Sequence, residues 1–317
     1  MKKLMIALIC FIFIMTGCNT ESTNKDTEGK LIIHTTVYPL ADFTEKIGGD
    51  YVSVESIYPP GVDEHSYEPS QKDIIDMANG NLFFYIGHNL EGFMNHAKPI
   101  LEDEGVKVIA IGEKVHIHKS KETHEEHEHE EHEDHDEHEH NHGSVDPHIW
   151  LDPLYAKQMA EAIKDELSEA LPEQQAYFED NFSKLEKELD NLNEQFTSVA
   201  NSAKVKEFVV SHAAYGYWEE RYGLIQLNIS GISTSQEPSQ KQLVNIIEEI
   251  ESKNLQYLLV EQNVSSKLVE VIQSETDTTT LPVHNLSVLT KTDIENEEDY
   301  FSLMEKNLET LKRALNP

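Results

Sequence analysis

Three isolated histidines stand in sequence contexts that suit the binding of a divalent metal ion. His65 lies in a loop after a predicted strand, and His212 comes two residues after the strand predicted at 207–210. His148 lies in the segment Asp146–Pro153. Ligands of parallel α/β lobes bind beyond the carboxyl ends of the strands, and neutral imidazoles are good tetrahedral ligands for zinc. We therefore expect His65, His148 and His212 to hold one metal ion in a cleft between two lobes.

A ligand ring also needs a partner at its second nitrogen, and two acids flank His148. Either Asp146 or Asp152 is a candidate for this role, the alternative being that both are ordinary capping or surface residues. Three other histidines are interpreted as structural, His34 in a strand and His88 and His96 on a predicted helix. Because imidazole binds metal only when neutral, metal affinity should fall as the pH drops through about 6.5.

A second group of histidines is concentrated in one acidic tract. Ten of the 17 histidines lie between residues 116 and 142. From Lys119 to His142 there are 11 acidic residues against two lysines, a net charge of −9 (2 − 11) with neutral histidines. Such a segment cannot bury enough apolar surface to fold, so we expect a disordered His/Glu-rich loop over 116–142. It would collect divalent metal ions with modest affinity, and the alternative is a solvated loop whose histidines are incidental.

The first residues are typical of an export signal. A basic start precedes an apolar run of 12 residues, Leu4 to Met15, which is shorter than the roughly 20 that a membrane-spanning helix needs. Two small residues then precede Cys18, as in the lipobox of a bacterial lipoprotein. We expect residues 1–17 to be a signal peptide, Cys18 to carry the lipid, and residues 18–30 to be a flexible tether. A cleaved secretory signal with an incidental cysteine is the alternative.

The composition argues against several classes of function. Lys and Arg number 25 against 59 Asp and Glu, a formal charge of −34, so the chain should repel a phosphate backbone and nucleic acid is not an expected partner. Both cysteines, Cys10 and Cys18, precede the region expected to fold, which excludes Cys-ligated metal sites there. The motifs of serine hydrolases, P-loop proteins and dinucleotide-binding enzymes are absent. We expect a binding protein and not an enzyme.

Strands and helices alternate in both halves of the chain, which is the pattern of parallel α/β sheets. Residues 31–152 are expected to form an N-terminal α/β lobe, and residues 204–317 a C-terminal α/β lobe. The predicted strands are 31–38, 51–58, 82–86, 106–111, 207–210, 224–229, 255–260 and 280–284. The predicted helices are 40–47, 71–78, 90–101, 215–222, 240–253, 267–275 and 300–315.

One pentapeptide occurs once in each half. The sequence Glu-Pro-Ser-Gln-Lys occupies residues 68–72 and 237–241, and each copy opens a predicted helix. Ser70 with Asp73, and Ser239 with Gln242, fit a capping box in which the serine hydroxyl accepts from a backbone amide three residues later. Matching positions in two βα halves favour an ancestral duplication, so we expect two pseudo-symmetric lobes.

A helical segment over 153–203 separates the two lobes. Within it, residues 173–202 contain neither glycine nor proline, and their apolar residues are spaced alternately by four and three. This spacing predicts a single apolar stripe on one long helix. A helix of about thirty residues is about 45 Å long. Because no flexible Gly/Ser linker is present, we expect a rigid helix packed along both lobes and no large hinge closure.

Together, these segments resemble one protein family along essentially the whole chain. The matching segments are Thr35–Pro39, Glu64–Ser70, the His/Glu-rich tract, Asp146–Pro153, His212–Tyr217 and Gln236–Ser239. They are similar to the cluster A-I solute-binding proteins of ABC transporters, specifically the high-affinity zinc-uptake lipoproteins. The resemblance implies two α/β lobes joined by a long rigid helix, with Zn(II) as bound cargo held by His65, His148 and His212. It further implies a lipoprotein on the outer face of the cell membrane that delivers zinc to an ABC permease, and we expect a monomer.

The resemblance leaves the fourth ligand open. Members of the family often supply a carboxylate from an Asn-x-Glu-x-Leu segment near the end of the chain, where this sequence has Ser287 in place of the Glu. A neutral hydroxyl is a poor zinc ligand. The candidates are Glu64, His284, Ser287 and water, of which we favour Glu64 or water.

Two alternative functions use the same residues. Three imidazoles favour zinc, whereas manganese-specific members of the family use more carboxylate ligands, so manganese uptake is one alternative. The other is a metal-binding surface adhesin or zinc buffer, in which the His/Glu-rich tract would be the working part.

Overall fold

The structure is a computed structural model, and it describes residues 29–117, 145–261 and 267–317. The predicted signal peptide, Cys18 and most of the predicted tether lie outside the described residues, and so does the His/Glu-rich tract apart from its first two residues. None of the helices within these ranges has the length and apolar character that crossing a bilayer requires.

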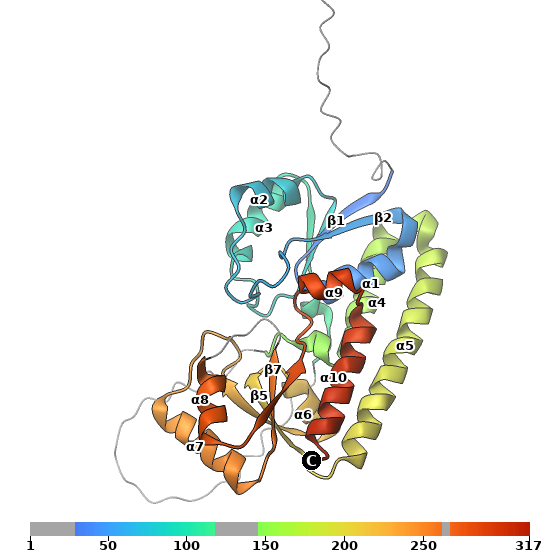
Figure 1. Cartoon of the computed structure of the whole chain (residues 1–317). Helices are drawn as coiled ribbons and strands as arrows, with labels where there is room; N and C mark the ends of the chain where they lie inside the picture. Colours follow the sequence, from blue (N-terminus) through green and yellow to red (C-terminus); the bar gives the residue numbers. More distant parts are fainter. Residues whose placement is uncertain (1–28, 118–144, 262–266) are drawn as a thin grey trace, which may run out of the picture.

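Two four-stranded sheets form the framework of the molecule (Figure 1). The strands are β1 (Leu31–Thr35), β2 (Val52–Ser56), β3 (Leu82–Tyr85), β4 (Lys107–Ala110), β5 (Glu207–His212), β6 (Ile225–Ser230), β7 (Tyr257–Glu261) and β8 (Thr279–Val283). The α-helices are α1 (Tyr38–Gly48), α2 (Gln71–Ala78), α3 (Met94–Asp103), α4 (Pro153–Ala170), α5 (Gln175–Ser202), α6 (Gly216–Tyr222), α7 (Gln240–Ser252), α8 (Lys267–Glu275), α9 (Lys291–Glu295) and α10 (Tyr300–Ala314). Short 3-10 turns are η1 (Gly49–Tyr51), η2 (Gly112–Lys114), η3 (Ile149–Leu151) and η4 (Pro172–Gln174).

The two sheets have the same topology. The strand order is β2-β1-β3-β4 in the N-terminal lobe and β6-β5-β7-β8 in the C-terminal lobe, with all neighbours parallel. In the first sheet Ile33 of β1 lies opposite Val54 and Leu82, and in the second Val209 of β5 lies opposite Leu227 and Leu258. The predicted α/β fold with two pseudo-symmetric lobes is therefore confirmed.

The repeated pentapeptide forms the same local structure in both lobes. Ser70 Oγ accepts from the amide of Asp73 at the start of α2, and Ser239 Oγ accepts from the amide of Gln242 at the start of α7, each at 3.3 Å. The Asp73 and Gln242 side chains accept in return from the serine amides. Both predicted capping boxes are present, so each motif satisfies amides that the first turn of a helix leaves without partners.

The long helix α5 runs along both lobes at one side of the molecule (Figure 1). It has 28 residues and begins at Gln175, two residues later than predicted, because the 3-10 turn η4 precedes it. In the N-terminal half the ring of Phe178 contacts Tyr51 at 6.1 Å between centroids. In the C-terminal half Phe196 contacts Trp218 at 5.2 Å. One apolar stripe therefore packs against both lobes, as the spacing predicts.

The larger of two apolar cores continues from one lobe into the other. The same cluster of buried side chains includes Phe83 of the first sheet, Trp150 between the lobes and Val210 of the second sheet. Hydrogen bonds reinforce this junction, since Trp150 Nε1 donates to the Asn285 carbonyl at 2.6 Å and the Tyr300 hydroxyl donates to the Trp150 carbonyl at 2.8 Å. Moving one lobe against the other would open this core, which opposes hinge motion.

The structure corrects the helix predicted over residues 90–101. The helix α3 begins only at Met94, so His96 is helical and His88 is not. His88 and Asn89 have left-handed backbone angles, with φ of 51° and 64°. The buried carboxylate of Glu91 accepts from the amides of residues 86 and 87 at 2.8 and 3.0 Å and so favours a turn over a helix here. A hydrogen bond between His88 Nε2 and the Gly112 carbonyl gives this histidine a structural contact.

Candidate metal centre

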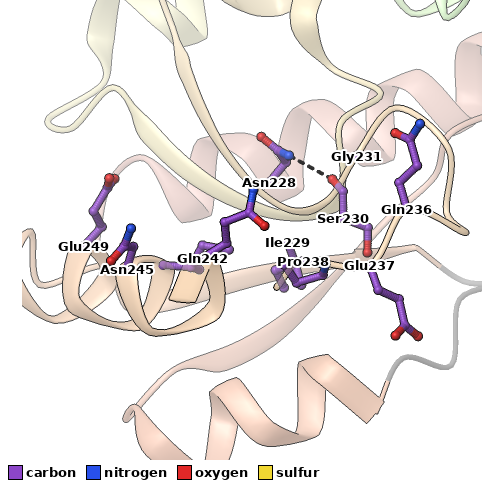
Figure 2. A pocket seen from close by; sticks show the side chains of 11 residues that line it. Asn228, Ile229, Ser230, Gly231, Gln236, Glu237, Pro238, Gln242, Asn245 and Glu249 are labelled. Atoms are coloured by element: carbon purple, nitrogen blue, oxygen red, sulfur yellow. Dashed lines mark hydrogen bonds between the residues drawn. The ribbon is translucent and has the colours of Figure 1, made fainter. Parts of the chain in front are cut away.

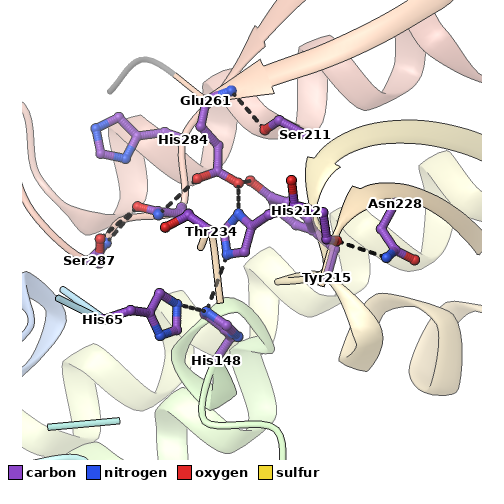
Figure 3. A network of polar contacts seen from close by, with 12 residues as sticks. His65, His148, Ser211, His212, Tyr215, Asn228, Thr234, Glu261, His284 and Ser287 are labelled. Carbon is purple, nitrogen blue, oxygen red and sulfur yellow. Dashed lines mark hydrogen bonds and ion pairs between the residues drawn. The ribbon is translucent and has the colours of Figure 1, made fainter. Parts of the chain in front are cut away.

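The three histidines with metal-binding contexts meet between the two lobes (Figure 3). His65 comes from the loop between β2 and α2, His148 directly precedes η3, and His212 is the last residue of β5. Their candidate ligand atoms all lie within 4.8 Å of one another. His148 and His212 have no exposed surface, and the side chain of His65 is 9% exposed. In the described ranges no other group of His, Cys, Asp or Glu side chains is arranged in this way.

The distances between the ring nitrogens match a tetrahedral metal site. His148 Nε2 lies 3.3 Å from His65 Nε2 and 3.4 Å from His212 Nε2. In a tetrahedron with metal–nitrogen bonds of about 2.0–2.1 Å, ligand atoms are about 3.3–3.4 Å apart. A zinc ion placed between these nitrogens would therefore need little rearrangement of the side chains.

Two carboxylates, of which Glu261 is buried, orient two of the rings. Asp146 Oδ1 lies 2.7 Å from His148 Nδ1 and also accepts from the backbone amide of His148 at 3.0 Å. Glu261 Oε1 lies 2.5 Å from His212 Nδ1. In both rings Nδ1 then carries the proton and donates it to the carboxylate, which leaves the Nε2 lone pair available for metal.

Of the two acids proposed to orient a ring, Asp152 has a different role. Its carboxylate accepts from the amides of Leu154 and Tyr155 at 2.9 Å and so caps α4. It also pairs with Arg221. Asp152 therefore fixes the helix that follows the metal-binding segment and contacts no histidine in the part of the chain that the structure describes.

Glu261 was missed by the sequence analysis. It is 3% exposed and ends β7, which pairs with the strand that carries His212. Its position just past the strand predicted over residues 255–260 was the available signal, because the carboxyl ends of neighbouring parallel strands meet at one edge. Nothing in the amino-acid types alone distinguishes it from other acids at strand ends.

Glu64 lies beside the three histidines, bridged to Glu261 by an amide. Its side chain is 4% exposed, and its Oε1 is 3.9 Å from His65 Nε2. Asn285 Nδ2 donates to Glu64 Oε1 at 3.2 Å and to Glu261 Oε2 at 3.0 Å. The amide and hydroxyl of Ser287 both donate to Asn285 Oδ1, at 3.0 and 2.8 Å. Ser287 thus orients Asn285, and the two buried carboxylates provide negative charge that a divalent cation would offset.

His284, another candidate for the fourth ligand, has both ring nitrogens engaged elsewhere. Its Nε2 lies 3.1 Å from Asp293 Oδ2, and its Nδ1 accepts from the Leu286 amide at 2.9 Å. Of the candidate side chains, Glu64 is therefore the one that places a carboxylate next to the histidines.

The surroundings give the histidines different proton affinities. Burial, together with the nearby imidazoles of His148 and His212, lowers the pKa of His65 to about 4. Burial also opposes protonation of His212, but the adjacent Glu261 carboxylate outweighs it and raises the pKa of His212 above its usual value. Burial raises the pKa of Glu64. At neutral pH His65 is ready to bind metal, whereas His212 holds a proton more tightly than a free imidazole.

The chain is similar in sequence to known zinc-binding and zinc-uptake proteins. The sequence profile described as the periplasmic zinc-uptake complex component A matches residues 33–314. The zinc-binding lipoprotein AdcA of Streptococcus pneumoniae is 34% identical over 317 residues, which cover 99% of this chain and 61% of AdcA. The high-affinity zinc uptake system protein ZnuA of Bacillus subtilis is 32% identical, with 98% of this chain and 97% of that protein covered. The chain thus spans about three fifths of the AdcA relatives and nearly all of ZnuA.

Among solved structures, the Zn(II)-bound ZnuA-like domain of Streptococcus pneumoniae AdcA is similar to this fold. The TM-score is 0.74 at 31% sequence identity, and the match covers 91% of this chain and all of that domain. The two-lobed architecture described above is thus shared with a domain solved with zinc bound.

Proposed function

Because the chain belongs to the zinc-uptake complex component A family, we propose that it captures Zn(II) outside the cytoplasmic membrane and delivers it to an ABC importer. The observation that supports this most directly is the pair of Nε2–Nε2 separations, 3.3 and 3.4 Å, which match a tetrahedral zinc site. The ion is cargo in this proposal, and the protein binds and releases it without catalysing a reaction.

The proposed ligands are the Nε2 atoms of His65, His148 and His212, with Glu64 as the fourth. Three imidazoles and one carboxylate suit zinc better than manganese, which prefers oxygen ligands. Asp146 and Glu261 hold the two most buried rings in the orientation that presents Nε2.

The proposed location and partner follow from the family and from the start of the sequence. Zinc-uptake components act in a complex, so a membrane permease is the partner that would receive the ion. A lipid on Cys18 would keep a monomeric protein at the outer face of the membrane, and the streptococcal relative AdcA carries the name lipoprotein. In this scheme the His/Glu-rich tract over 116–142 collects zinc weakly and yields it to the tighter site.

Isothermal titration calorimetry with zinc tests the site. The wild-type protein should show one tight site that is lost in His65→Ala and in His212→Ala and kept in His96→Ala, since His96 is exposed on α3. Deletion of residues 119–142 should leave that tight site in place. If tight binding disappears with the tract and survives in His212→Ala, the cleft is not the zinc site.

A further inference from the structure

The loop between β6 and α7, residues 231–239, joins the two lobes next to the metal centre without providing a ligand. Thr234 Oγ1 donates to Asp63 Oδ2 at 2.7 Å, a contact between residues 171 positions apart. Thr234 belongs to the C-terminal lobe and Asp63 to the N-terminal loop that carries His65. Figure 3 shows Thr234 in the same view as the three histidines.

Asp63 also bonds to the backbone of the loop that carries His65. Its second oxygen, Oδ1, accepts from the backbone amide of His65 at 2.9 Å. One carboxylate thus connects the Thr234 hydroxyl to the backbone of a proposed ligand. Hydrogen bonds to an ionised acceptor belong to the stronger class.

The first residue of the same loop is hydrogen-bonded next to His212, a proposed ligand from the C-terminal lobe. The amide of Ala213, next to His212, donates to the Gly231 carbonyl at 3.1 Å. The loop is also closed on itself, since the Gly231 amide donates to the Gln236 carbonyl at 3.0 Å. A Cβ on Gly231 would lie 2.9 Å from Gln236 Cβ, so a larger residue here would push this closure apart. The loop therefore forms a short, ordered connection from the neighbour of His212 to the neighbour of His65.

His65 is the ligand that most needs such a connection. The rings of His148 and His212 are held at Nδ1 by carboxylates. In the described residues no carboxylate contacts Nδ1 of His65, so its position depends on the backbone of its loop.

A cavity lies beside the connecting loop (Figure 2). The cavity has a volume of about 410 Å³, and its lining includes Ser230, Gly231, Gln236, Glu237 and Asn245. The cavity borders both ends of the loop, at Gly231 and at residues 236–238, so the loop ends are not packed against side chains on that side.

We propose that Thr234 and Asp63 are positioning residues that hold His65 against His148 and His212 and so set how fast zinc leaves the site. This inference rests on the proposed function. The hydrogen bond between them must break before the His65 loop can move away from the ion, and the loop 231–239 is the element that yields.

The test is the rate at which an excess of EDTA removes zinc from the full-length protein, followed by stopped-flow. Thr234→Val keeps the shape and removes the hydroxyl, and it should accelerate zinc release on the order of tenfold, as expected for a lost hydrogen bond to a charged group. Thr234→Ser keeps the hydroxyl and should restore the wild-type rate. Both rates are measured well below the melting temperatures of the zinc-free variants, so that faster release in Thr234→Val cannot result from unfolding.

Two further variants make the test specific. Ser235→Ala removes a neighbouring hydroxyl that bonds only within the loop, to Ser233 Oγ, and should release zinc at the wild-type rate. In an Asp63→Ala background, Thr234→Val should add no further acceleration, because the two residues act through one contact.

The inference is overturned if Thr234→Val releases zinc at the wild-type rate, or if Thr234→Ser or Ser235→Ala is as fast as Thr234→Val. Those outcomes leave the proposed function standing, provided that the wild-type protein binds one zinc tightly and His212→Ala does not. Loss of that difference between wild type and His212→Ala would refute the proposed function itself.

Discussion

His65 and His212 differ in what surrounds each ring, and this determines how strongly each ring holds a proton. His212 is paired with Glu261 at 2.5 Å, which raises its pKa, whereas burial among other imidazoles lowers the pKa of His65 to about 4. A metal ion must displace a proton only from a ring that carries one. Of these two ligands, His212 and not His65 should therefore contribute to the pH dependence of zinc binding near neutral pH.

The first prediction concerns this pH dependence. Because the pKa of His212 is raised, its proton competes with zinc already above pH 6.5, and zinc affinity should fall about tenfold per pH unit below that raised pKa. His65 should add no loss until the pH approaches 4. In Glu261→Gln the raising charge is gone, so the onset of the loss should move to lower pH. Competition titrations with a zinc chelator between pH 8 and 5 measure this, and an unchanged onset in the variant would contradict the assigned cause.

The second prediction concerns the fourth ligand. Glu64→Gln should weaken zinc binding by about 10–100-fold, the range seen when a group that supports a metal site is lost. Glu68→Gln is the matched control, because Glu68 is an exposed acid in the same loop and should bind zinc like the wild type. If Glu64→Gln keeps the wild-type affinity, water and not Glu64 completes the coordination.

At the scale of single elements, α5 is the helix that packs against both lobes. Leu189 lies in the middle of its apolar stripe and is fully buried, whereas the neighbouring Glu188 is exposed. The third prediction is that Leu189→Ala lowers the free energy of unfolding of the zinc-free protein by about 2–5 kcal/mol, the cost of a cavity in a packed core. Glu188→Ala should change it by no more than about 0.5 kcal/mol. Urea unfolding followed by circular dichroism compares them, and equal effects would mean that the stripe is not a core.

The elements show how far sequence reasoning reaches. Spacing rules predicted the long helix α5 and both capping boxes, because these depend on residues three or four positions apart. The start of α3 was mispredicted because the buried Glu91 side chain bonds back to the amides of residues 86 and 87 and holds the chain before Met94 in turns. Glu261 and the Thr234–Asp63 contact were not predicted, since they join positions 49 and 171 residues apart through a fold that local patterns do not specify.

At the scale of the whole molecule, the apolar core that continues between the lobes opposes a large movement on binding. The fourth prediction is that zinc leaves the radius of gyration unchanged, because only the His65 loop and the loop 231–239 need to adjust. Small-angle X-ray scattering of the zinc-free and zinc-bound protein, with residues 119–142 deleted so that the tract does not contribute, gives the comparison. A clear decrease on adding zinc would show that the lobes close as rigid bodies despite α5.

The most direct test is the anomalous scattering of a crystal grown with one equivalent of zinc, recorded on both sides of the zinc absorption edge. We predict one strong peak between the lobes, at about 2.0–2.1 Å from the Nε2 atoms of His65, His148 and His212. A peak elsewhere, with these three nitrogens bound to nothing, would contradict zinc capture in the cleft.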